Sequence, residues 1–394
     1  MQYPIGIQSF KKLREDGYDY VDKTDLIYNL TRQGQYYFLS RPRRFGKSLL
    51  LSTIEAYFEG RKDLFEGLAI AELEKAWNAY PVIHIDMNTG NFKSIDGLSR
   101  RINLTLQEQE KKHGQPTIDT DSGLRLESLI KNIYESTGSK VVVLIDEYDK
   151  PLLNAIGNPE LQEAMRDELR DLYSVMKSCD QYIRFAMLTG VTKFGRLSVF
   201  SGLNNLNDIS FRAEYAAICG ITEEEMLSYF IEPIEGMAVK YGCAVQDIVN
   251  KLRNMYDGYR FSRADTLVYN PFSLLNAFES CDFGAYWFAT GTPMYLVEIL
   301  QRNDYELSGL EGATASVAQL SAFNPDTSYD PIPVMYQSGY LTIKDYDIED
   351  DEFTLGFPNN EVRQGFSEYI LPFYVDNEAA MTHTPSPGRP TIAK

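Results

Sequence analysis

The sequence YYFLSRPRRFGKS, residues 36–48, decides how the rest of the chain is interpreted. Its first part, Tyr36–Ser40, is a short apolar run that predicts a buried strand. A helix is expected from Lys47 through Phe58, because Gly60 follows as a stop signal. The loop between them contains three arginines and leads into glycine, lysine and serine. A strand, a basic loop and a helix in this order are typical of a phosphate-binding turn.

The second half of the phosphate-binding pattern G-x-x-x-x-G-K-[ST] fits the end of this loop. Gly46 allows the backbone to approach a phosphate closely, Lys47 can reach the β and γ phosphates, and the Ser48 hydroxyl can bind Mg²⁺. Arg41 occupies the place of the first glycine. Taken alone, the half-pattern is equally compatible with a helix that happens to begin with a lysine. The residues expected to contact a nucleotide are Arg43, Arg44, Phe45, Gly46, Lys47, Ser48 and Leu49.

A second element is an apolar run, Val141–Ile145, that ends in the adjacent carboxylates Asp146 and Glu147. It predicts a buried strand with both carboxylates at its carboxyl end. The first carboxylate would hold Mg²⁺ together with Ser48, and the second would activate a water as a general base. An acidic helix cap after a buried strand is the alternative interpretation. Because both patterns occur in one chain, we expect an ATP and Mg²⁺ site with Glu147 and Lys47 as catalytic residues.

Three further residues are candidates for the same site. Thr189 ends the strand predicted from Ile183 and is expected as a third catalytic residue, which could orient the attacking water or sense the γ-phosphate. An ordinary strand-end turn is the alternative. Arg196 and Arg212 could each supply positive charge to a transition state, from the same chain or from a neighbouring subunit. Each is otherwise interpreted as a surface arginine.

The order of the expected elements indicates an α/β fold. Strands at 36–40, 81–86, 140–146 and 183–189 alternate with helices, which predicts an ASCE-type parallel sheet covered on both faces in a P-loop NTPase domain at 1–215. A helical lid is expected at 216–320, where a capping box at Thr222 opens a helix to Tyr241. A short helix followed by two strands predicts a winged-helix-like module at 321–375, and a proline-rich tail follows at 376–394.

Composition excludes several classes of protein. The net charge of −18 disfavours a nucleic-acid partner, and the predicted wing at 345–352 is itself acidic. Four cysteines and three histidines are scattered without metal-ligand spacing. No apolar run is long enough to cross a membrane and no secretory signal is visible, so a cytoplasmic protein is expected.

Several segments together resemble a known family, the bacterial AAA-ATPase-like proteins that usually carry a PD-(D/E)XK nuclease-like domain at the carboxyl terminus. The segments are YVDKT at 20–24, LSRPRRFGKS at 39–48, LFEGL at 64–68, LIDEYD at 144–149, YDGY at 256–259 and GFPNNEV at 356–362. In that family the first P-loop glycine is normally missing, as it is here. The resemblance implies ATP binding by residues 46–48, with Asp146 and Glu147 as the magnesium and water-activating pair.

The resemblance also sets an expectation about the end of the chain. In the family the last of these segments leads into the nuclease-like domain, whereas this chain ends soon afterwards. The sequence contains no carboxylate cluster with an E-x-K pair beside a core strand, so no nuclease site is expected. Whether a truncated chain or a short natural gene explains this stays open.

The expected function is ATP binding with slow, Mg²⁺-dependent hydrolysis, used as a conformational switch to which the lid and the winged-helix-like module respond. A protein partner or a second copy of the chain is the expected macromolecular partner. The alternative is a non-catalytic, nucleotide-bound regulatory protein that reads nucleic acid through its winged helix. A scaffold without catalysis is a third interpretation.

Overall fold

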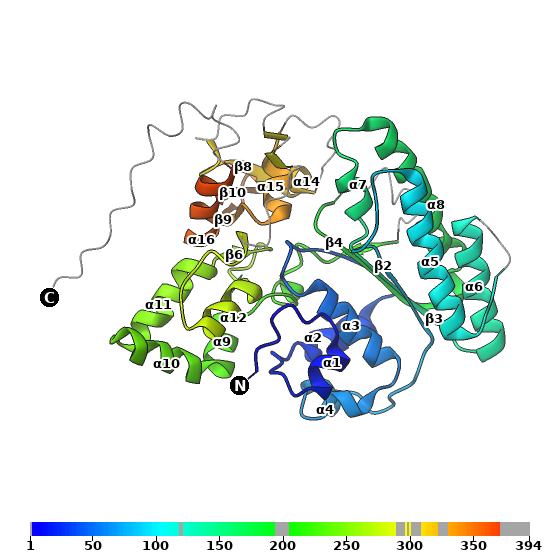
Figure 1. The fold of residues 1–394 in the computed structure, drawn as a ribbon, viewed down its shortest axis with the longest axis horizontal. Helices are drawn as coiled ribbons and strands as arrows, with labels where there is room; N and C mark the ends of the chain where they lie inside the picture. Colours follow the sequence, from blue (N-terminus) through cyan, green and yellow to red (C-terminus); the bar gives the residue numbers. More distant parts are fainter. Residues whose placement is uncertain are drawn as a thin grey trace.

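The structure is a computed structural model of the 394-residue chain. It describes residues 2–117, 121–193, 205–288, 296–297, 299–300, 309–321 and 330–370. A parallel sheet surrounded by helices occupies the first half of the chain, and a helical part and a small antiparallel sheet follow it (Figure 1).

The central sheet has the strand order β2-β3-β4-β1-β5, and every neighbouring pair is parallel. Every residue of β1 and β3 is buried, which explains why both read as continuous apolar runs. Because β4 lies between β1 and β3, the carboxyl ends of these three strands meet at one edge of the sheet. The strands are β1 Tyr36–Ser40, β2 Val82–Asp86, β3 Val141–Asp146, β4 Ile183–Gly190 and β5 Asn207–Asp208.

Helices form two groups around this sheet, on different sides of it in Figure 1. The first group is α1 Phe10–Glu15, α2 Thr24–Gln33, α3 Lys47–Phe58 and α4 Ala69–Leu73. The second group is α5 Ile95–His113, α6 Ser122–Thr137 and α8 Pro159–Ser178, with the short α7 Lys150–Asn154 above them in the view. None of the helices within the described ranges is long and apolar enough to cross a bilayer.

The helical part that follows has its own apolar cluster, which includes Met226, Phe230, Leu252 and Phe278. Its elements are α9 Glu223–Tyr229, α10 Ile231–Tyr241, α11 Val245–Tyr256 and α12 Pro271–Ser280, with the short strands β6 Tyr259–Arg260 and β7 Leu267–Val268 between α11 and α12.

The last described part contains a three-stranded antiparallel sheet in the order β8-β10-β9. Its apolar side chains, among them Met335, Tyr340 and Phe353, belong to the same buried cluster as the central sheet, so this part is continuous with the first core. Its elements are β8 Thr314–Ser316, α14 Val317–Leu320, α15 Ile332–Ser338, β9 Thr342–Asp347, β10 Glu352–Gly356 and α16 Asn360–Gly365, followed by one π-helical turn at Phe366–Ile370.

The predicted α/β fold is confirmed, with a parallel sheet that is consistent with a P-loop NTPase. Two details differ from the expectation. The helix expected from Thr222 to Tyr241 is divided into α9 and α10 at Phe230, because Pro233 has no N–H to donate to the carbonyl of Tyr229. Strand β8 of the small sheet lies before residue 321, where the winged-helix-like module was expected to begin. It was not predicted, because three residues are too few to show an alternating pattern.

The loop after α11 touches the last part of the chain closely at Gly258. Its φ of 94° lies in the left-handed region, and a Cβ there would be 2.3 Å from the carbonyl oxygen of Pro358. Asn359 strengthens the same contact, because its side-chain amide donates to the carbonyl of Asp257 at 2.8 Å. The helical part and the last part of the chain are therefore joined through backbone contacts that need a glycine.

We predict that Gly258→Ala destabilises the protein by about 3 kcal/mol, because the added methyl group meets backbone rather than a movable side chain. Gly242→Ala is the matched control: Gly242 also has a positive φ, of 64°, but nothing lies within 4 Å of its added Cβ. The control should cost about 1 kcal/mol. Chemical denaturation measures both, and equal costs would contradict the close contact.

Candidate nucleotide-binding site

The loop between β1 and α3 has the backbone shape expected of a phosphate cradle. Gly46 has a φ of 95° and caps the amino terminus of α3, and Arg44 also has a positive φ, of 69°. The first N–H groups of a helix have no partner within it, and the helix dipole makes that end positive. The turn therefore presents the amino end of α3, together with Lys47 and Ser48, to an anion.

Lys47 is almost completely buried, with 3% of its side chain exposed. Its ammonium group donates to the carbonyl oxygens of Arg41 and Pro42, at 3.1 and 3.2 Å. It also lies 3.5 Å from Oε1 of Glu147. Two backbone carbonyls of the loop and the Glu147 carboxylate thus surround the buried positive charge of Lys47.

Asp146 ends β3 and is held from several sides. The hydroxyl of Thr189 donates to its Oδ1 at 2.6 Å, and the backbone N–H of Glu147 donates to the same oxygen at 3.0 Å. Burial, and then the charge of Glu147, raise the pKa of Asp146, whereas hydrogen bonds from Ser48 and Thr189 and the charge of Lys47 oppose this rise. The carboxylate therefore lies beside the serine expected to share a metal ion with it.

Glu147 adopts a φ of 54°, which is unusual for a residue with a side chain. Burial alone would raise the pKa of Glu147, but the charges of Lys47, Lys150 and Arg43 outweigh it and lower the pKa. Glu147 is therefore a charged carboxylate at neutral pH. A strained backbone at such a position is common in functional sites.

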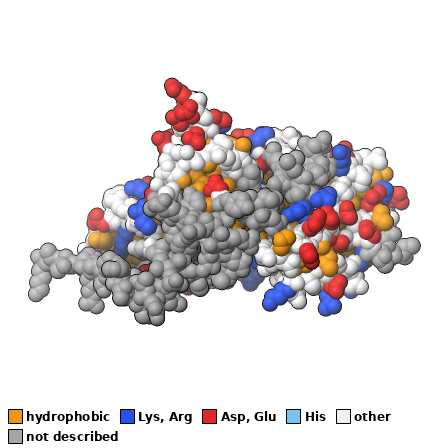
Figure 2. All heavy atoms as spheres, turned by 90° about the horizontal axis from the view of Figure 1, so that it is seen from above, with side chains coloured by type: hydrophobic (Ala, Val, Ile, Leu, Met, Phe, Trp, Pro, Cys, Tyr) orange, Lys and Arg blue, Asp and Glu red, His pale blue; other side chains and the backbone are white. Residues whose placement is uncertain are grey.

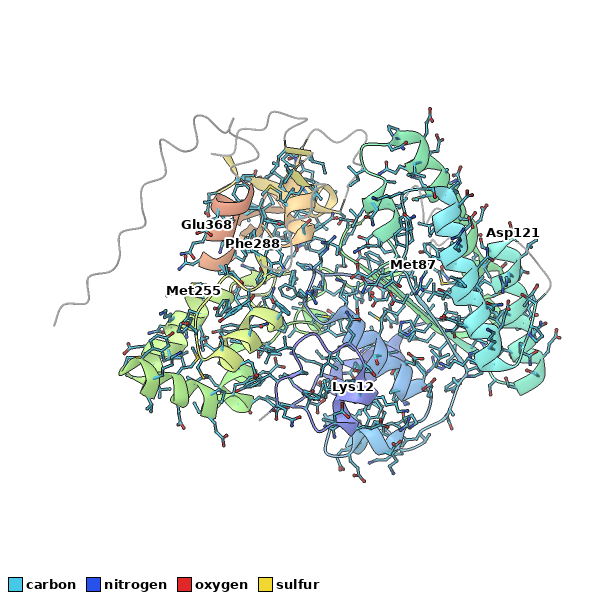
Figure 3. All side chains as sticks on the ribbon, viewed as in Figure 1. Lys12, Met87, Asp121, Met255, Phe288 and Glu368 are labelled. Atoms are coloured by element: carbon cyan, nitrogen blue, oxygen red, sulfur yellow. The ribbon has the colours of Figure 1, made fainter. Side chains whose placement is uncertain are left out.

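Segments that lie far apart in the sequence meet around Asp146 and Glu147. Met87, labelled in Figure 3, lies inside the molecule directly after β2, and its N–H donates to the carbonyl of Asp146 at 3.0 Å. Tyr148 and Asp149 follow Glu147 in the sequence and form hydrogen bonds with the turn after β4. The hydroxyl of Tyr148 donates to the carbonyl of Thr192 at 2.8 Å.

Asp149 has a positioning role that the sequence did not assign. Its Oδ2 accepts from the N–H groups of Val191 and Thr192, at 3.0 and 2.6 Å, and from the Thr192 hydroxyl at 2.7 Å. Burial, and then the charge of Glu147, raise the pKa of Asp149 to about 6. The sequence does show Asp149 as a third carboxylate soon after the buried strand. It could not show that this side chain contacts the turn after β4, because that contact depends on the tertiary structure.

A pocket of about 360 Å³ opens beside the P-loop. Its lining includes Arg43, Arg44, Lys47 and Ser48 of the P-loop, and Glu147 lies beside Lys47. Further walls come from the amino-terminal segment 4–8 and from the start of α12 at Pro271 and Phe272, which sequence reasoning missed because no local pattern marks them. The pocket is large enough for a triphosphate with its metal ion, and its charge is suited to one.

The remaining sequence candidates are placed as follows. Leu49 lines the pocket from the first turn of α3. The ring of Phe45 is buried against Tyr259 and Phe261, at centroid distances of 4.7 and 5.5 Å, so only the backbone of Phe45 is available to a phosphate. Arg196 lies outside the described residues.

Arg212 is a surface residue in this chain. It pairs with Glu214 at 3.3 Å, and 46% of its side chain is exposed. The structure does not bring it to the pocket, whose described lining lacks it. A contribution to a neighbouring subunit stays a prediction.

Arg41 takes the place of the first P-loop glycine and is one of the largest fully buried side chains of the described chain. Its guanidinium donates to the carbonyls of Ser40, Ser210 and Tyr215, at 2.9 to 3.1 Å. It also lies 4.3 Å from the ring centroid of Phe261. The arginine therefore ties the P-loop to the segment after β5 and to the helical part.

We predict that Arg41→Gly, which restores the usual pattern, destabilises the protein by about 3–5 kcal/mol. The substitution leaves buried carbonyls unpaired and a cavity in place of the side chain. Arg212→Gly is the control and should cost about 1 kcal/mol or less, because its ion pair is exposed. Thermal and chemical denaturation test this; a stable Arg41→Gly protein would contradict the role assigned to the arginine.

Comparison with known proteins identifies the family of this chain. Residues 4–200 match the family described as "Predicted AAA-ATPase". The chain is also 40% identical over 382 residues to a protein of Azotobacter chroococcum mcd 1 named "Uncharacterized protein in vnfD 5'region", covering 96% of this chain and 71% of that protein. No solved structure matches the chain. The chain thus belongs to the AAA-ATPase-like family of P-loop proteins.

Proposed function

We propose that this protein binds ATP with Mg²⁺, hydrolyses it slowly, and uses the cycle as a conformational switch. The observation that carries the proposal is the contact between Lys47 and Glu147, which lie 3.5 Å apart in the lining of the pocket. It joins the P-loop to the carboxylate expected to activate water. Membership of the AAA-ATPase-like family supports nucleotide binding independently.

The residues present fit a Mg²⁺ ion bound together with phosphate. Ser48 lies close enough to Asp146 to influence the pKa of its carboxyl group, so a metal ion held by both would have two oxygen ligands from the protein. No cluster of three or more potential ligands exists among the described residues, so phosphate oxygens and water would complete the coordination. A bound Mg²⁺ would neutralise charge on the β and γ phosphates.

Lys47 would exchange partners when phosphate arrives. Its ammonium group now binds two loop carbonyls and faces Glu147. A triphosphate offers stronger, charged acceptors at the same place. Once Lys47 has turned to the phosphates, an oxygen of Glu147 is released to accept a proton from the attacking water.

Thr189 would act through Asp146 rather than through the water. Its hydroxyl is already committed to Oδ1 of Asp146 at 2.6 Å, which fixes the carboxylate's direction. Asp149 would support this arrangement by holding the turn that follows Thr189. We propose both as positioning residues.

Contacts around the P-loop support the switch part of the proposal. The indole N–H of Trp287 donates to the carbonyl of Arg43 at 3.3 Å, and a Cβ at Gly339 would lie 2.8 Å from the Pro42 ring. Gln337 accepts the N–H of Lys193, just after β4, at 2.7 Å. We therefore propose that residues 216–320 act as a helical lid, and 321–375 as a winged-helix-like module, that follow movements of the P-loop.

The second candidate function, a nucleic-acid-binding protein with a winged helix, has less support. The end of β9 and the turn that follows it expose Asp345, Asp347, Glu349, Asp350 and Asp351. Figure 2 shows acidic side chains gathered on a projection of the molecule. Such a wing would repel phosphates. A steady-state phosphate-release assay with and without DNA or RNA distinguishes the two functions.

We predict that Lys47→Ala abolishes measurable Mg·ATP binding in calorimetric titration, because the cradle loses its central positive charge. Lys12→Ala is the matched control, since Lys12 lies on α1 at the surface, away from the pocket (Figure 3). The control should bind as the parent does. Equal affinity in the Lys47→Ala protein would refute the P-loop assignment.

We predict different outcomes for the two carboxylates. Asp146→Asn should weaken both Mg·ATP affinity and turnover, because it removes a metal ligand. Glu147→Gln should retain affinity while turnover falls about 100-fold or more, as expected when a general base is lost.

Glu368→Gln, an exposed substitution of the same chemistry labelled in Figure 3, is the control and should turn over at the parent rate. Phosphate release and calorimetry together measure all three variants. Parental turnover by Glu147→Gln would leave the protein as a nucleotide-binding scaffold.

A further inference from the structure

Lys150 is a further cation of the pocket, contributed by the turn that follows β3. It is the first residue of α7, three positions after Glu147, and its backbone N–H donates to the Glu147 carbonyl at 3.0 Å. The half-buried Lys150 side chain is part of the pocket lining, together with Glu147 and Arg43. A positive charge from outside the P-loop therefore lies near the carboxylate expected to activate water.

The turn that carries Lys150 is fixed to the neighbouring strand. Tyr148 donates its backbone N–H to the carbonyl of Thr189 at 3.0 Å. Asp149, which is completely buried, accepts the N–H and the hydroxyl of Thr192 at 2.6 and 2.7 Å. The start of α7 is thus held by buried hydrogen bonds to β4 and the turn after it, and such a support keeps a catalytic side chain in place.

The ammonium group of Lys150 differs from that of Lys47 in having no fixed partner. Lys47 donates to two loop carbonyls. Within the described ranges, no hydrogen bond or ion pair is formed by the Lys150 ammonium or by the Arg43 guanidinium. Burial, and then the charge of Arg43, lower the pKa of Lys150, although the charge of Glu147 opposes this effect. An anion bound near both cations would stabilise them.

Phosphoryl transfer in P-loop enzymes is accelerated by a cation at the transferring group, and this cation can come from the same chain or from another. Arg212 is exposed and absent from the described pocket lining. Arg44 lies over the ring of Phe272, 4.8 Å from its centroid. Lys150 combines an unpaired ammonium group with a place on the same turn as Glu147, where the attacking water is expected.

We propose that Lys150 is the cation that stabilises the transition state of ATP hydrolysis within its own chain, so that turnover needs no residue from a neighbouring subunit. This inference rests on the function proposed above. Water attacks the γ-phosphorus and gives a proton to Glu147, while the bond to the oxygen that bridges the β and γ phosphates breaks, and ADP and inorganic phosphate are formed. Lys150 interacts with the charge that develops on the transferring group and exchanges no proton.

The first test is Lys150→Met, which keeps the approximate length of the side chain and removes its charge. Turnover should fall about 100-fold or more, while affinity for a non-hydrolysable ATP analogue with Mg²⁺ should stay within about fivefold of the parental value. Affinity for ADP with aluminium fluoride, which imitates the transition state, should fall much more than affinity for the ATP analogue. Lys150→Arg, which retains the charge, should keep at least about a tenth of parental turnover.

Lys140→Met is the matched control, because Lys140 is exposed directly before β3, at the end of the strand opposite to Asp146. It should resemble the parent in turnover and in both affinities.

A mixing experiment tests whether Lys150 acts within its own chain. Lys150→Met and Glu147→Gln chains are combined, and turnover is compared with that of each variant alone. A lysine that acts on its own pocket leaves the mixture as slow as the separate variants. Turnover per chain of the parent should also stay constant when the protein is diluted.

The inference is overturned if Lys150→Met hydrolyses ATP at the parental rate, or weakens both analogues equally. Restored turnover in the mixture, or loss of parental turnover on dilution, also overturns it. If Lys150→Met does not bind the ATP analogue, Lys150→Gln takes its place under the same criteria, and loss of binding in both variants counts against the inference. A parent that does not bind Mg·ATP, or binds it without hydrolysis, would instead refute the proposed function.

Discussion

A buried lysine ammonium must be surrounded by oxygen atoms, and this requirement organises the site. Lys47 satisfies it with two P-loop carbonyls and a contact to Glu147. The loop that carries these carbonyls turns through left-handed conformations at Arg44 and Gly46 before α3 begins. A polyanion can replace all three partners at once. The same interaction therefore holds the lysine at the place where a phosphate would bind.

Contacts with other segments also hold the P-loop of this protein. Arg41 fills the place of a glycine and binds three carbonyls, and Trp287, which follows α12, donates to the carbonyl of Arg43. Glu361 in turn accepts the N–H of Trp287 at 2.8 Å and the hydroxyl of Ser273 at 3.0 Å. A change in the loop therefore has a direct route to α12 and α16.

Much of the fold could be predicted from the sequence, because local patterns mark it. The apolar runs and the G-K-S turn predicted the bounds of β1, β3 and α3 to within a residue. The walls of the pocket could not be predicted, since segment 4–8 and Phe272 reach it only through tertiary packing. In the sequence, Arg41 could be recognised only as a departure from the usual glycine. The three carbonyls that its guanidinium binds became known from the structure.

The most direct test of this account is a crystal structure of the protein with Mg²⁺ and a non-hydrolysable ATP analogue. The account predicts a triphosphate on the amino end of α3, with Lys47 turned from the carbonyls of Arg41 and Pro42 to the phosphates. It also predicts a metal ion between Ser48 and Asp146. A nucleotide bound elsewhere, or a Lys47 that keeps its loop carbonyls beside a bound triphosphate, would contradict it.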